Sequence, residues 1–484
     1  MKRYVWVFSA VITCGILLSF NARADEPALS QKEVADLAKP SVVKIVQHVK
    51  GDAVIPAIKI DFTNLDVATD TGKTPKTIQI DEYLTGSGII ISPDGYILTN
   101  SHVVSYQTVK NLIVSDFIYS AIDNGYANLS EEEAQKVNAN RNPAAMTEFS
   151  KKIVDFMLSS SKFNLSKTVS VLNPTSPKGT LEELANDGFP TTVISVNDNF
   201  FQDSRDAALL KIPESNLPSI AVGSTEGVST GKKVFIYGYP STAEVSDQDL
   251  LVPTFSEGSI SAIKDSLNND FKIFQTDAKI SKGSSGGPLL DEQGRLIGLV
   301  TFITSDLTKQ DGDSFAFAIP IDEAQDIVKK SRVTGELPAS FRAGAYDNHF
   351  LTGLDLLHSN RCKKALSEFG LAKQINQNFP VGGFLASYAK QCEEIISSGK
   401  SVDTPWDFIK SFFKDTKYLV LIIAGAGIIL IAVLAYLWFW LFRRMKYEAR
   451  ELDNVEDYLN LSLEDGKPEE NKRDFELPDS LKPK

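Results

Sequence analysis

Cysteine is scarce in this sequence, because 484 residues contain only three, too few for a disulfide scaffold. Glycine (30) and proline (21) stay near their ordinary frequencies, which excludes collagen-like and low-complexity chains. Positive charge is also in short supply: 50 Lys and Arg stand against 62 Asp and Glu, giving a net charge of −12. The body of the chain has no basic cluster, so we expect no nucleic-acid binding. With 43% hydrophobic residues, the chain can form one or two folded domains with real cores.

The first 24 residues have the pattern of a cleavable signal peptide. Met1-Lys2-Arg3 is followed by an apolar run, and Ala22 and Ala24 supply the small residues of a cleavage site. An uncleaved anchor helix is the alternative interpretation. Either way, the residues that follow are sent across a membrane.

A second apolar stretch covers residues 418–442 without a single charge. At about 1.5 Å per residue a helix of this length exceeds the ~30 Å hydrocarbon core, which predicts a transmembrane helix. Aromatic residues crowd its C-terminal end, and Arg443-Arg444-Met445-Lys446 follows at once. The charge asymmetry predicts a single span with the body outside the cytoplasm and residues 443–484 as a cytoplasmic tail.

Residues 25–345 form the largest block, in which short β-rich runs alternate with turns. Asp94-Gly95 between two apolar runs is a strong hairpin signal. We therefore expect a mainly β domain built as a sandwich or barrel. Helical spacing interrupts this pattern and predicts a helical insertion at about residues 107–165, in which Met146, Phe149 and Ile153 share a face.

Helical periodicity returns at residues 346–400, where we expect three helices with short connections. A juxtamembrane linker, 401–417, leads to the predicted transmembrane helix. The charged, proline-bearing tail is expected to be largely disordered.

Three residues in the β block have the chemistry of a nucleophilic site. Ser285 lies in the glycine-rich loop Lys282–Leu289, whose glycines allow a tight turn with converging amide groups. His102 follows the predicted hairpin at a strand end, where it is placed to act as a base for the hydroxyl. Asp206 precedes an apolar strand and supplies a carboxylate to orient the imidazole. Each residue alone also fits a structural role: a surface turn, a packed histidine or an ordinary strand start.

The order His102, Asp206, Ser285 favours the functional interpretation, because it is the order of chymotrypsin-like enzymes. The surrounding segments resemble the Deg/HtrA branch of the trypsin-like serine proteases over about residues 30–335. These segments are GSGI (86–89), TNSHVV (99–104), DAALLKI (206–212), QTDA (275–278), GSSGGPL (283–289) and FAFAIPI (315–321).

The resemblance implies two perpendicular six-stranded antiparallel β-barrels with a catalytic triad in the cleft between them. It also implies an oxyanion hole formed by the backbone amides of Gly283 and Ser285, with Ser284 between them. The primary specificity pocket is expected near Lys279 and Ile280: an apolar pocket if Ile280 lines it, whereas Lys279 either points inward or is solvated outside.

The sequence departs from the family at three places. Ser284 stands where the family usually has asparagine, and the separation of 104 positions between His102 and Asp206 is much longer than usual. The PDZ domain that commonly follows the protease is not found. Residues 346–400 are too short for one and helical instead.

This helical segment resembles a tetratricopeptide unit, because small and aromatic residues fall at the repeat's offsets: Gly353, Ala365, Phe369 and Ala372. A generic helical hairpin is the alternative. Cys362 and Cys392 would lie on adjacent helices in an oxidising compartment, so either a disulfide or two buried thiols is expected.

These observations predict a serine endopeptidase in the bacterial inner membrane, with its protease domain in the periplasm. Its substrates would be extracytoplasmic polypeptides, in protein quality control or regulated proteolysis, and its helical module would receive a protein partner. We expect no metal and no cofactor. The alternative is a catalytically silent adaptor that keeps the protease fold for binding. An esterase is disfavoured because the three residues do not follow the Ser-Asp-His order along the chain.

Overall fold

The computed structural model describes most of the chain between residues 28 and 446. The described residues are 28–139, 142–173, 179–241, 244, 246, 249–266, 270–301, 316–330, 344–376, 379, 382–404, 407 and 427–446. The predicted signal peptide, most of the linker and the tail beyond 446 lie outside them. The chain divides into two compact units, residues 1–403 and 404–484.

The first sheet contains seven strands in the order β7-β6-β1-β4-β5-β9-β8. They are β1 (Val42–Ile55), β4 (Lys76–Ile90), β5 (Tyr96–Thr99), β6 (Lys162–Leu172), β7 (Phe189–Pro190), β8 (Thr192–Val196) and β9 (Ala208–Lys211). The expectation of a six-stranded barrel is wrong for this sheet, which has seven strands and whose edge strands β7 and β8 do not pair with each other among the described residues. Phe189 and Pro190 pair with β6 and add a short edge strand that no sequence periodicity marks.

The second sheet closes as the expected six-stranded antiparallel barrel, in the order β10-β11-β12-β15-β14-β13. Its strands are β10 (Lys233–Gly238), β11 (Thr254–Asp265), β12 (Lys272–Thr276), β13 (Pro288–Leu290), β14 (Leu296–Thr301) and β15 (Ala316–Pro320). Helix α9 (Ile321–Lys330) follows β15 directly.

The two sheets share one hydrophobic core. Ile89 and Leu98 of the first sheet pack in the same buried cluster as Phe235 and Leu299 of the second, together with Ile321 of α9. Helix α2 (Gln31–Ala38) and the short helix η1 (Lys39–Ser41) lead into β1. Because side chains of both sheets pack in one buried cluster, residues at the facing ends of the two sheets stay at fixed positions relative to one another.

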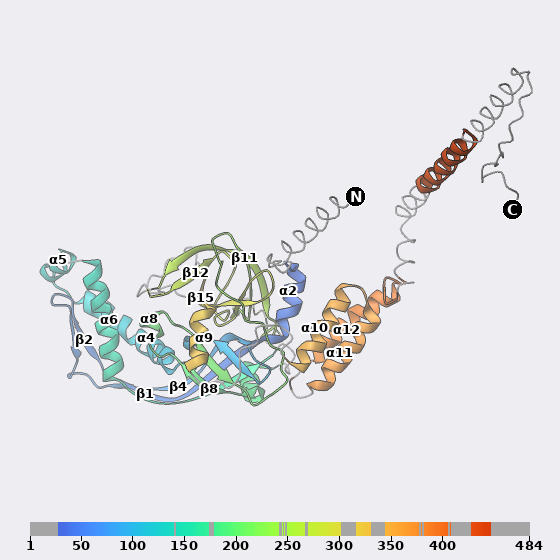
Figure 1. Cartoon of the computed structure of the whole chain (residues 1–484). Helices are drawn as coiled ribbons and strands as arrows, with labels where there is room; N and C mark the ends of the chain where they lie inside the picture. The colour runs from blue at the N-terminus through green and yellow to red at the C-terminus, as the bar shows by residue number, and fades with distance from the viewer. Residues whose placement is uncertain are drawn as a thin grey trace, which may run out of the picture. The chain divides into compact units, whose positions relative to one another are not determined.

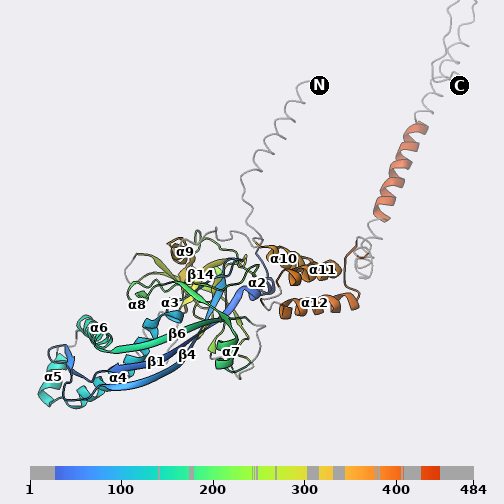
Figure 2. The same cartoon turned by 90° about the horizontal axis from the view of Figure 1, so that it is seen from below.

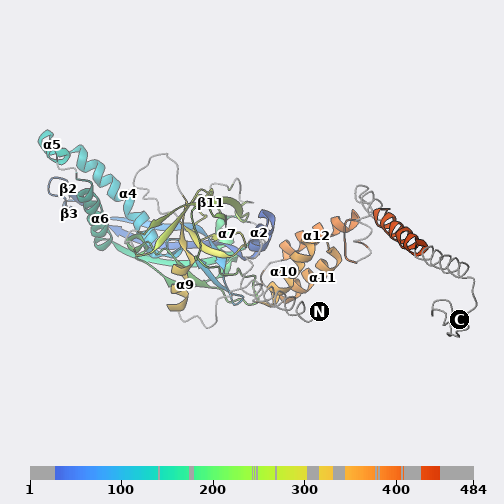
Figure 3. The ribbon, with the colours of Figure 1, turned by 45° about the horizontal axis from the view of Figure 1, so that its top comes forward.

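The helical insertion is confirmed as a cluster of helices between β5 and β6. Its helices are α4 (Tyr106–Ala127), α5 (Glu131–Ala139) and α6 (Pro143–Ser160), and they gather with the hairpin β2 (Ile58–Asp61)–β3 (Asp66–Thr69) (Figures 1 and 3). The predicted face of α6 is buried through Phe149, Ile153 and Met157. The insertion ends earlier than residue 165, because β6 begins at Lys162.

Three helices follow α9 within the first unit, close to the predicted bounds. They are α10 (Ala345–His358), α11 (Cys362–Ile375) and α12 (Gly382–Ser397). A side chain at Gly353 would lie 2.5 Å from the Phe369 ring, so this glycine lets α10 and α11 approach closely. Tyr346 and Phe350 of α10 share a buried cluster with Val43 of the first sheet. The helices therefore pack on the sheet.

Cys362 and Cys392 are two free, buried thiols in this structure, in line with the second of the two alternatives, and a disulfide between them stays a prediction. Their side chains hydrogen-bond to each other. Burial and this contact raise the pKa of Cys392 to about 12.

In the second unit, Gly427–Lys446 is a helix of 20 residues with a mean hydropathy of 1.8, long and apolar enough to cross a membrane. It overlaps the predicted span 418–442, whose first part lies outside the described residues. The first unit also contains three short helices: α3 (Ser101–Val104), α7 (Leu181–Asp187) and α8 (Phe200–Asp203). Helix α7 packs near β6.

The contact between α10 and the segment that joins β9 to β10 predicts a pH-dependent stability. Asp347 is buried and accepts hydrogen bonds from the Ser219 amide (3.2 Å) and hydroxyl (2.6 Å). Burial nevertheless raises its pKa to about 7, so the folded state binds a proton more tightly than the unfolded state does. This stabilisation is complete below the unfolded pKa near 3.8 and is lost as the pH rises through 7.

We therefore expect the melting temperature of the wild type to fall between pH 5 and 8 by at least about 2 °C more than that of Asp347→Asn. Asp326→Asn, at an exposed position of α9, makes the same charge change and should keep the wild-type pH dependence. Identical pH profiles for the wild type and Asp347→Asn would contradict the assignment.

Candidate active site

The position of His102 is fixed by the pairing of β5 with β9. Thr99 at the end of β5 lies opposite Ala208 at the start of β9. The Asn100 side chain donates to the Asp206 carbonyl (2.6 Å), and the Ser101 hydroxyl donates to the Ala207 carbonyl (2.6 Å). Helix α3 therefore starts directly beside the segment that enters β9.

His102 and Asp206 are joined by two hydrogen bonds. The His102 ring nitrogen Nδ1 lies 2.5 Å from Asp206 Oδ2, and the His102 amide donates to Oδ1 at 2.9 Å. The Thr301 hydroxyl, from the second barrel, also donates to Oδ2 at 2.7 Å. The Asp206 carboxylate thus accepts hydrogen bonds from residues that both sheets position.

The electrostatics of this contact favour a charged carboxylate. Burial opposes the charge on Asp206, but the His102 charge and the hydrogen bonds outweigh burial and hold the pKa of Asp206 below its usual value. An ionised Asp206 keeps the proton of neutral His102 on Nδ1, which leaves Nε2 as an acceptor. The imidazole is then in the tautomer that a general base requires.

The loop of Ser285 follows β12 and is tied to the first sheet. The Ser87 amide donates to the Ser285 carbonyl (2.8 Å), and the Ser87 hydroxyl donates to the Gly283 carbonyl (2.7 Å). Gly286 has a φ of +82°, and a side chain there would meet Thr99 Oγ1 at 2.3 Å. The loop therefore packs against the end of β5, three residues before His102.

The same loop presents its amides outward from the chain. The Lys282 carbonyl accepts from the Ser241 amide (2.7 Å) and hydroxyl (3.0 Å). Because the peptide group is planar and trans, the Gly283 N–H points the opposite way. Among the described residues, the amides of Gly283 and Ser285 have no acceptor. Gly283 has a φ of +92°, which a residue with a side chain rarely adopts.

The structure thus brings His102 and Asp206 into direct contact and the Ser285 loop to the same sheet end. No hydrogen bond between described residues joins the Ser285 hydroxyl to His102; in unliganded enzymes such bonds are often long. Ser284 is buried, and its amide donates to the Ser281 carbonyl (3.0 Å) within the loop. The Ser284 hydroxyl accepts from the Ser281 amide (3.4 Å), so the serine that replaces the usual asparagine has a local structural contact.

The two predicted pocket residues differ in their surroundings. The Lys279 side chain is exposed, while its carbonyl accepts from the Ser256 hydroxyl (2.9 Å). Ile280 is half-buried and packs against the core of the second barrel. Exposure of Lys279 agrees with the solvated alternative, and the role of Ile280 in specificity stays a prediction.

Sequence reasoning missed Thr301 and Ser87. Thr301 ends the apolar strand β14 without any pattern that separates it from an ordinary strand residue, and the GSGI segment (86–89) marks Ser87 as part of the family resemblance without indicating its contact with the Ser285 loop. Both act through partners more than 90 positions away, so only the tertiary structure reveals them.

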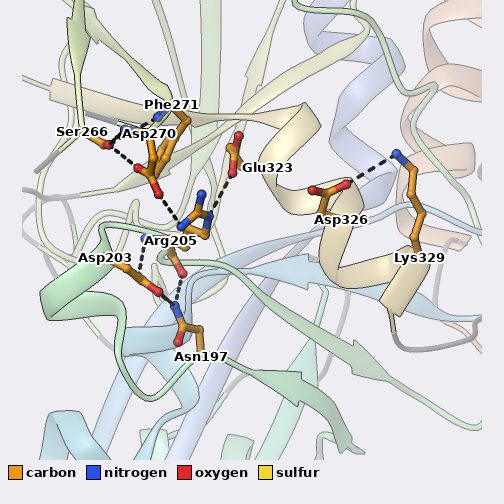
Figure 4. A network of polar contacts seen from close by, with 9 residues as sticks. All are labelled: Asn197, Asp203, Arg205, Ser266, Asp270, Phe271, Glu323, Asp326 and Lys329. Atoms are coloured by element: carbon orange, nitrogen blue, oxygen red, sulfur yellow. Dashed lines mark hydrogen bonds and ion pairs between the residues drawn. The ribbon is translucent and has the colours of Figure 1, made fainter. Parts of the chain in front are cut away.

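Arg205, which precedes Asp206, was also missed, and Figure 4 shows its surroundings. Its guanidinium pairs with Asp270 (2.7 Å) and Glu323 (3.1 Å) and lies over the Phe271 ring. Asp270 and Phe271 belong to the turn before β12, and Glu323 to α9. The residue next to the buried carboxylate is therefore held by the second barrel.

Asn197 and Asp203 complete this network on the side of the first sheet. The Asn197 side chain donates to Asp203 and to the Arg205 carbonyl (3.0 Å), and the Arg205 amide donates to Asp203 Oδ1 (2.9 Å). The loop that carries Arg205 and Asp206 is thus fixed from both sides. Within the described ranges, no group of three or more His, Cys, Asp or Glu side chains is arranged to hold a metal ion.

A hydrogen-bonded His–Asp pair beside a serine loop, held between two β sheets, is the type of site found in chymotrypsin-like serine peptidases. Residues 86–299 match the family model described as "Trypsin-like peptidase domain". The chain is therefore a homologue of the Deg/HtrA serine endopeptidases and carries their trypsin-like peptidase domain.

Curated relatives agree with this assignment. A "Probable periplasmic serine endoprotease DegP-like" of Pseudomonas putida is 25% identical over 355 residues, which cover 70% of this chain and 56% of the relative. "Serine endoprotease DegS" of Haemophilus influenzae is 34% identical over 132 residues, or 26% of this chain and 36% of the relative. The chain thus spans little more than half the length of the first of these relatives.

Among solved structures, "HtrA-type protease AlgW with decapeptide" is 21% identical, with 63% of this chain and 67% of that chain covered and a TM-score of 0.33.

The Thr301 contact predicts a measurable catalytic defect. Thr301→Val keeps the shape of the side chain but removes one donor from the buried carboxylate. Hydrogen bonds to charged groups contribute about 1.5–3 kcal/mol, so we expect kcat/KM for peptide hydrolysis to fall about 10- to 100-fold. Thr276→Val, buried on β12 of the same barrel, is the matched control. Equal rates for both variants would contradict a role of Thr301 at Asp206.

The Arg205 network predicts coupling between the two sheets. We expect Arg205→Met and Asp270→Asn each to lower kcat about five-fold, and the double variant to lose no more than either single one, because both break the same contact. Lys272→Met breaks the neighbouring Lys272–Asp265 pair on the same hairpin and should leave kcat unchanged. Additive losses in the double variant would show that Arg205 acts independently of Asp270.

Proposed function

We propose that this chain is a membrane-anchored serine endopeptidase that hydrolyses peptide bonds of extracytoplasmic proteins through His102, Asp206 and Ser285. The observation that carries the proposal is the buried Asp206 carboxylate, whose hydrogen bonds to His102 orient the imidazole. Burying a carboxylate is costly unless it is fully hydrogen-bonded. An arrangement of this kind is expected where the imidazole must be held in one tautomer and stabilised when charged.

In the proposed mechanism, Ser285 Oγ attacks the scissile carbonyl while His102 Nε2 takes the hydroxyl proton. The C–O bond forms as the carbonyl π electrons move to oxygen, and the amides of Gly283 and Ser285 donate to that oxyanion. His102 then gives its proton to the leaving amine as the C–N bond breaks. Water hydrolyses the acyl-enzyme by the same steps, with His102 as base and then acid.

The proposed oxyanion hole is supported by the anchored Lys282 carbonyl, because the Gly283 amide of the same peptide group points away from that anchor. A single oxyanion donor typically contributes about 10²–10³ in rate. Preorganised amides need no rearrangement during the reaction, so the shape of the loop matters as much as its side chains.

We place the enzyme in the bacterial inner membrane with its peptidase domain in the periplasm. The support comes from the apolar helix Gly427–Lys446, the basic residues at its C-terminal end and the signal-like first 24 residues. The Pseudomonas putida relative is described as a probable periplasmic protein. A membrane anchor would keep proteolysis close to the membrane surface, in quality control or in regulated cleavage.

We assign the helices α10–α12 a tetratricopeptide-like role in docking a protein partner. The close approach of α10 and α11 at Gly353, against Phe369, is the packing that such a repeat requires. Because a single repeat cannot bury its own face, α12 and the first sheet would serve as its caps.

A fluorophosphonate probe tests the proposed activity, because it labels only a serine that a base has activated. We expect the folded, detergent-solubilised wild type to be labelled and Ser285→Ala to remain unlabelled. Ser281→Ala, a serine of the same loop, should be labelled like the wild type. Absence of labelling in folded wild-type protein would reject the endopeptidase and favour the silent adaptor.

A further inference from the structure

Strand β4 has a long edge with no partner. It pairs with β1 along its whole length, from Ile89 opposite Val42 to Lys76 opposite Ile55. On its other edge it pairs with β5 only at Ile89 and Ile90. Within the part of the chain that the structure describes, no strand covers this edge between Lys76 and Gly88. Unpaired strand edges are ready to accept another extended chain.

The register identifies which backbone groups face this free edge. The Ser87 amide donates to the Ser285 carbonyl, so Ser87 directs its backbone away from β1. The pairing with β1 is continuous without a bulge, and backbone direction alternates along a strand. The residues that share this direction are Thr77, Gln79, Asp81, Tyr83 and Thr85. Among the described residues their N–H and C=O groups have no backbone partner.

Helix α4 forms a wall beside this edge, and the two enclose a groove of about 550 Å³. We call it the β4 edge groove: α4 side chains line one side of it, and the β4 residues that line the other are Lys76, Ile78, Gln79, Ile80, Glu82, Tyr83 and Leu84. Figure 2 shows α4 running alongside the β1–β4 ribbon. Ile80 of β4 packs with Val109 of α4, while Leu112 stays 58% exposed at the groove. Apolar side chains of both elements line the groove together with the charged Lys76, Glu82 and Asp116, and a large apolar side chain is available to a ligand.

The unpaired edge of β4 leads to the candidate active site at its inner end. Ser87, the next outward-facing residue after Thr85, is hydrogen-bonded to the Ser285 backbone. The wall also starts there, because α3 carries His102 and α4 begins at Tyr106. His102 is the group that protonates the leaving amine, so the polypeptide beyond that amine departs on the His102 side.

We propose that the β4 edge groove binds the substrate polypeptide beyond the scissile bond, on its leaving-amine side, as an extended strand paired with Thr77–Thr85. This inference rests on the proposed function and adds to it a substrate class. The paired stretch is about 26 Å long, at about 3.3 Å per residue. Pairing through the main chain tolerates many sequences, while the apolar side chains in the groove favour apolar ligand residues at alternate positions. Unfolded segments with strand-like alternation meet both requirements.

Two variants disturb the groove in different ways. Gln79→Pro removes an outward-facing N–H without removing any bond to β1, and proline is tolerated on strand edges. Leu112→Glu puts a charge on the exposed apolar wall. Leu371→Glu makes the same change at an exposed leucine of α11, outside the groove, and is the matched control.

Binding is measured in the Ser285→Ala full-length protein with a fluorescein-labelled peptide of about ten residues that alternates valine with threonine or lysine. We expect Gln79→Pro and Leu112→Glu each to weaken its Kd at least about five-fold, as loss of one net hydrogen bond or an apolar contact implies, with Leu371→Glu unchanged. Equal affinity in all variants, each with an unchanged melting curve, would overturn the proposal.

Cleavage separates this inference from the proposed function. Two quenched peptides share every residue up to the second position after the scissile bond, and only one continues for six further residues. We expect the long peptide to have at least about five-fold higher kcat/KM in the wild type, and this advantage to vanish in Gln79→Pro. Cleavage of both peptides at equal rates would reject the groove and keep the endopeptidase. No cleavage of either peptide, with binding intact, would reject the endopeptidase instead.

Discussion

The rest of the structure depends on one buried carboxylate that is hydrogen-bonded from both sheets. Asp206 receives two contacts from His102 and one from Thr301 of the second barrel. A charge at this depth is tolerated only with such partners. The requirement fixes the distance between the end of β5, the start of β9 and the end of β14, and so sets the relative position of the two sheets.

The neighbouring contacts hold this arrangement in place. Arg205, the residue before the carboxylate, forms ion pairs with the turn before β12 and with α9. Ser87 connects the Ser285 loop to β4 from the other side. Each link joins segments from different sheets, so displacement of one barrel would disturb the histidine, the carboxylate and the serine loop together. A rigid frame of this kind is what preorganised catalysis requires.

The sequence predicted the parts of the site that leave local patterns. The Asp94-Gly95 turn predicted the hairpin that ends in β5 and is followed by His102, and the apolar run after Asp206 predicted β9. Thr301, Arg205 and the free edge of β4 were out of reach, because they are defined by partners distant in sequence. The additional strand of the first sheet, β7, is only two residues long, too short to show a periodic pattern of hydrophobic residues. The sequence correctly placed Cys362 and Cys392 on adjacent helices, but the positions of two cysteines in a sequence do not determine whether their thiols are oxidised.

The hydrolysis rate of Asp206→Asn at neutral pH tests the central claim most directly. Asparagine preserves the shape of the side chain but turns an N–H toward His102 Nδ1, which selects the tautomer that cannot act as a base. In a trypsin-like serine protease the equivalent Asp→Asn substitution lowers kcat about 10⁴-fold, and we expect a loss of that order here. A folded Asp206→Asn protein that cleaves peptides within about ten-fold of the wild-type rate would contradict it.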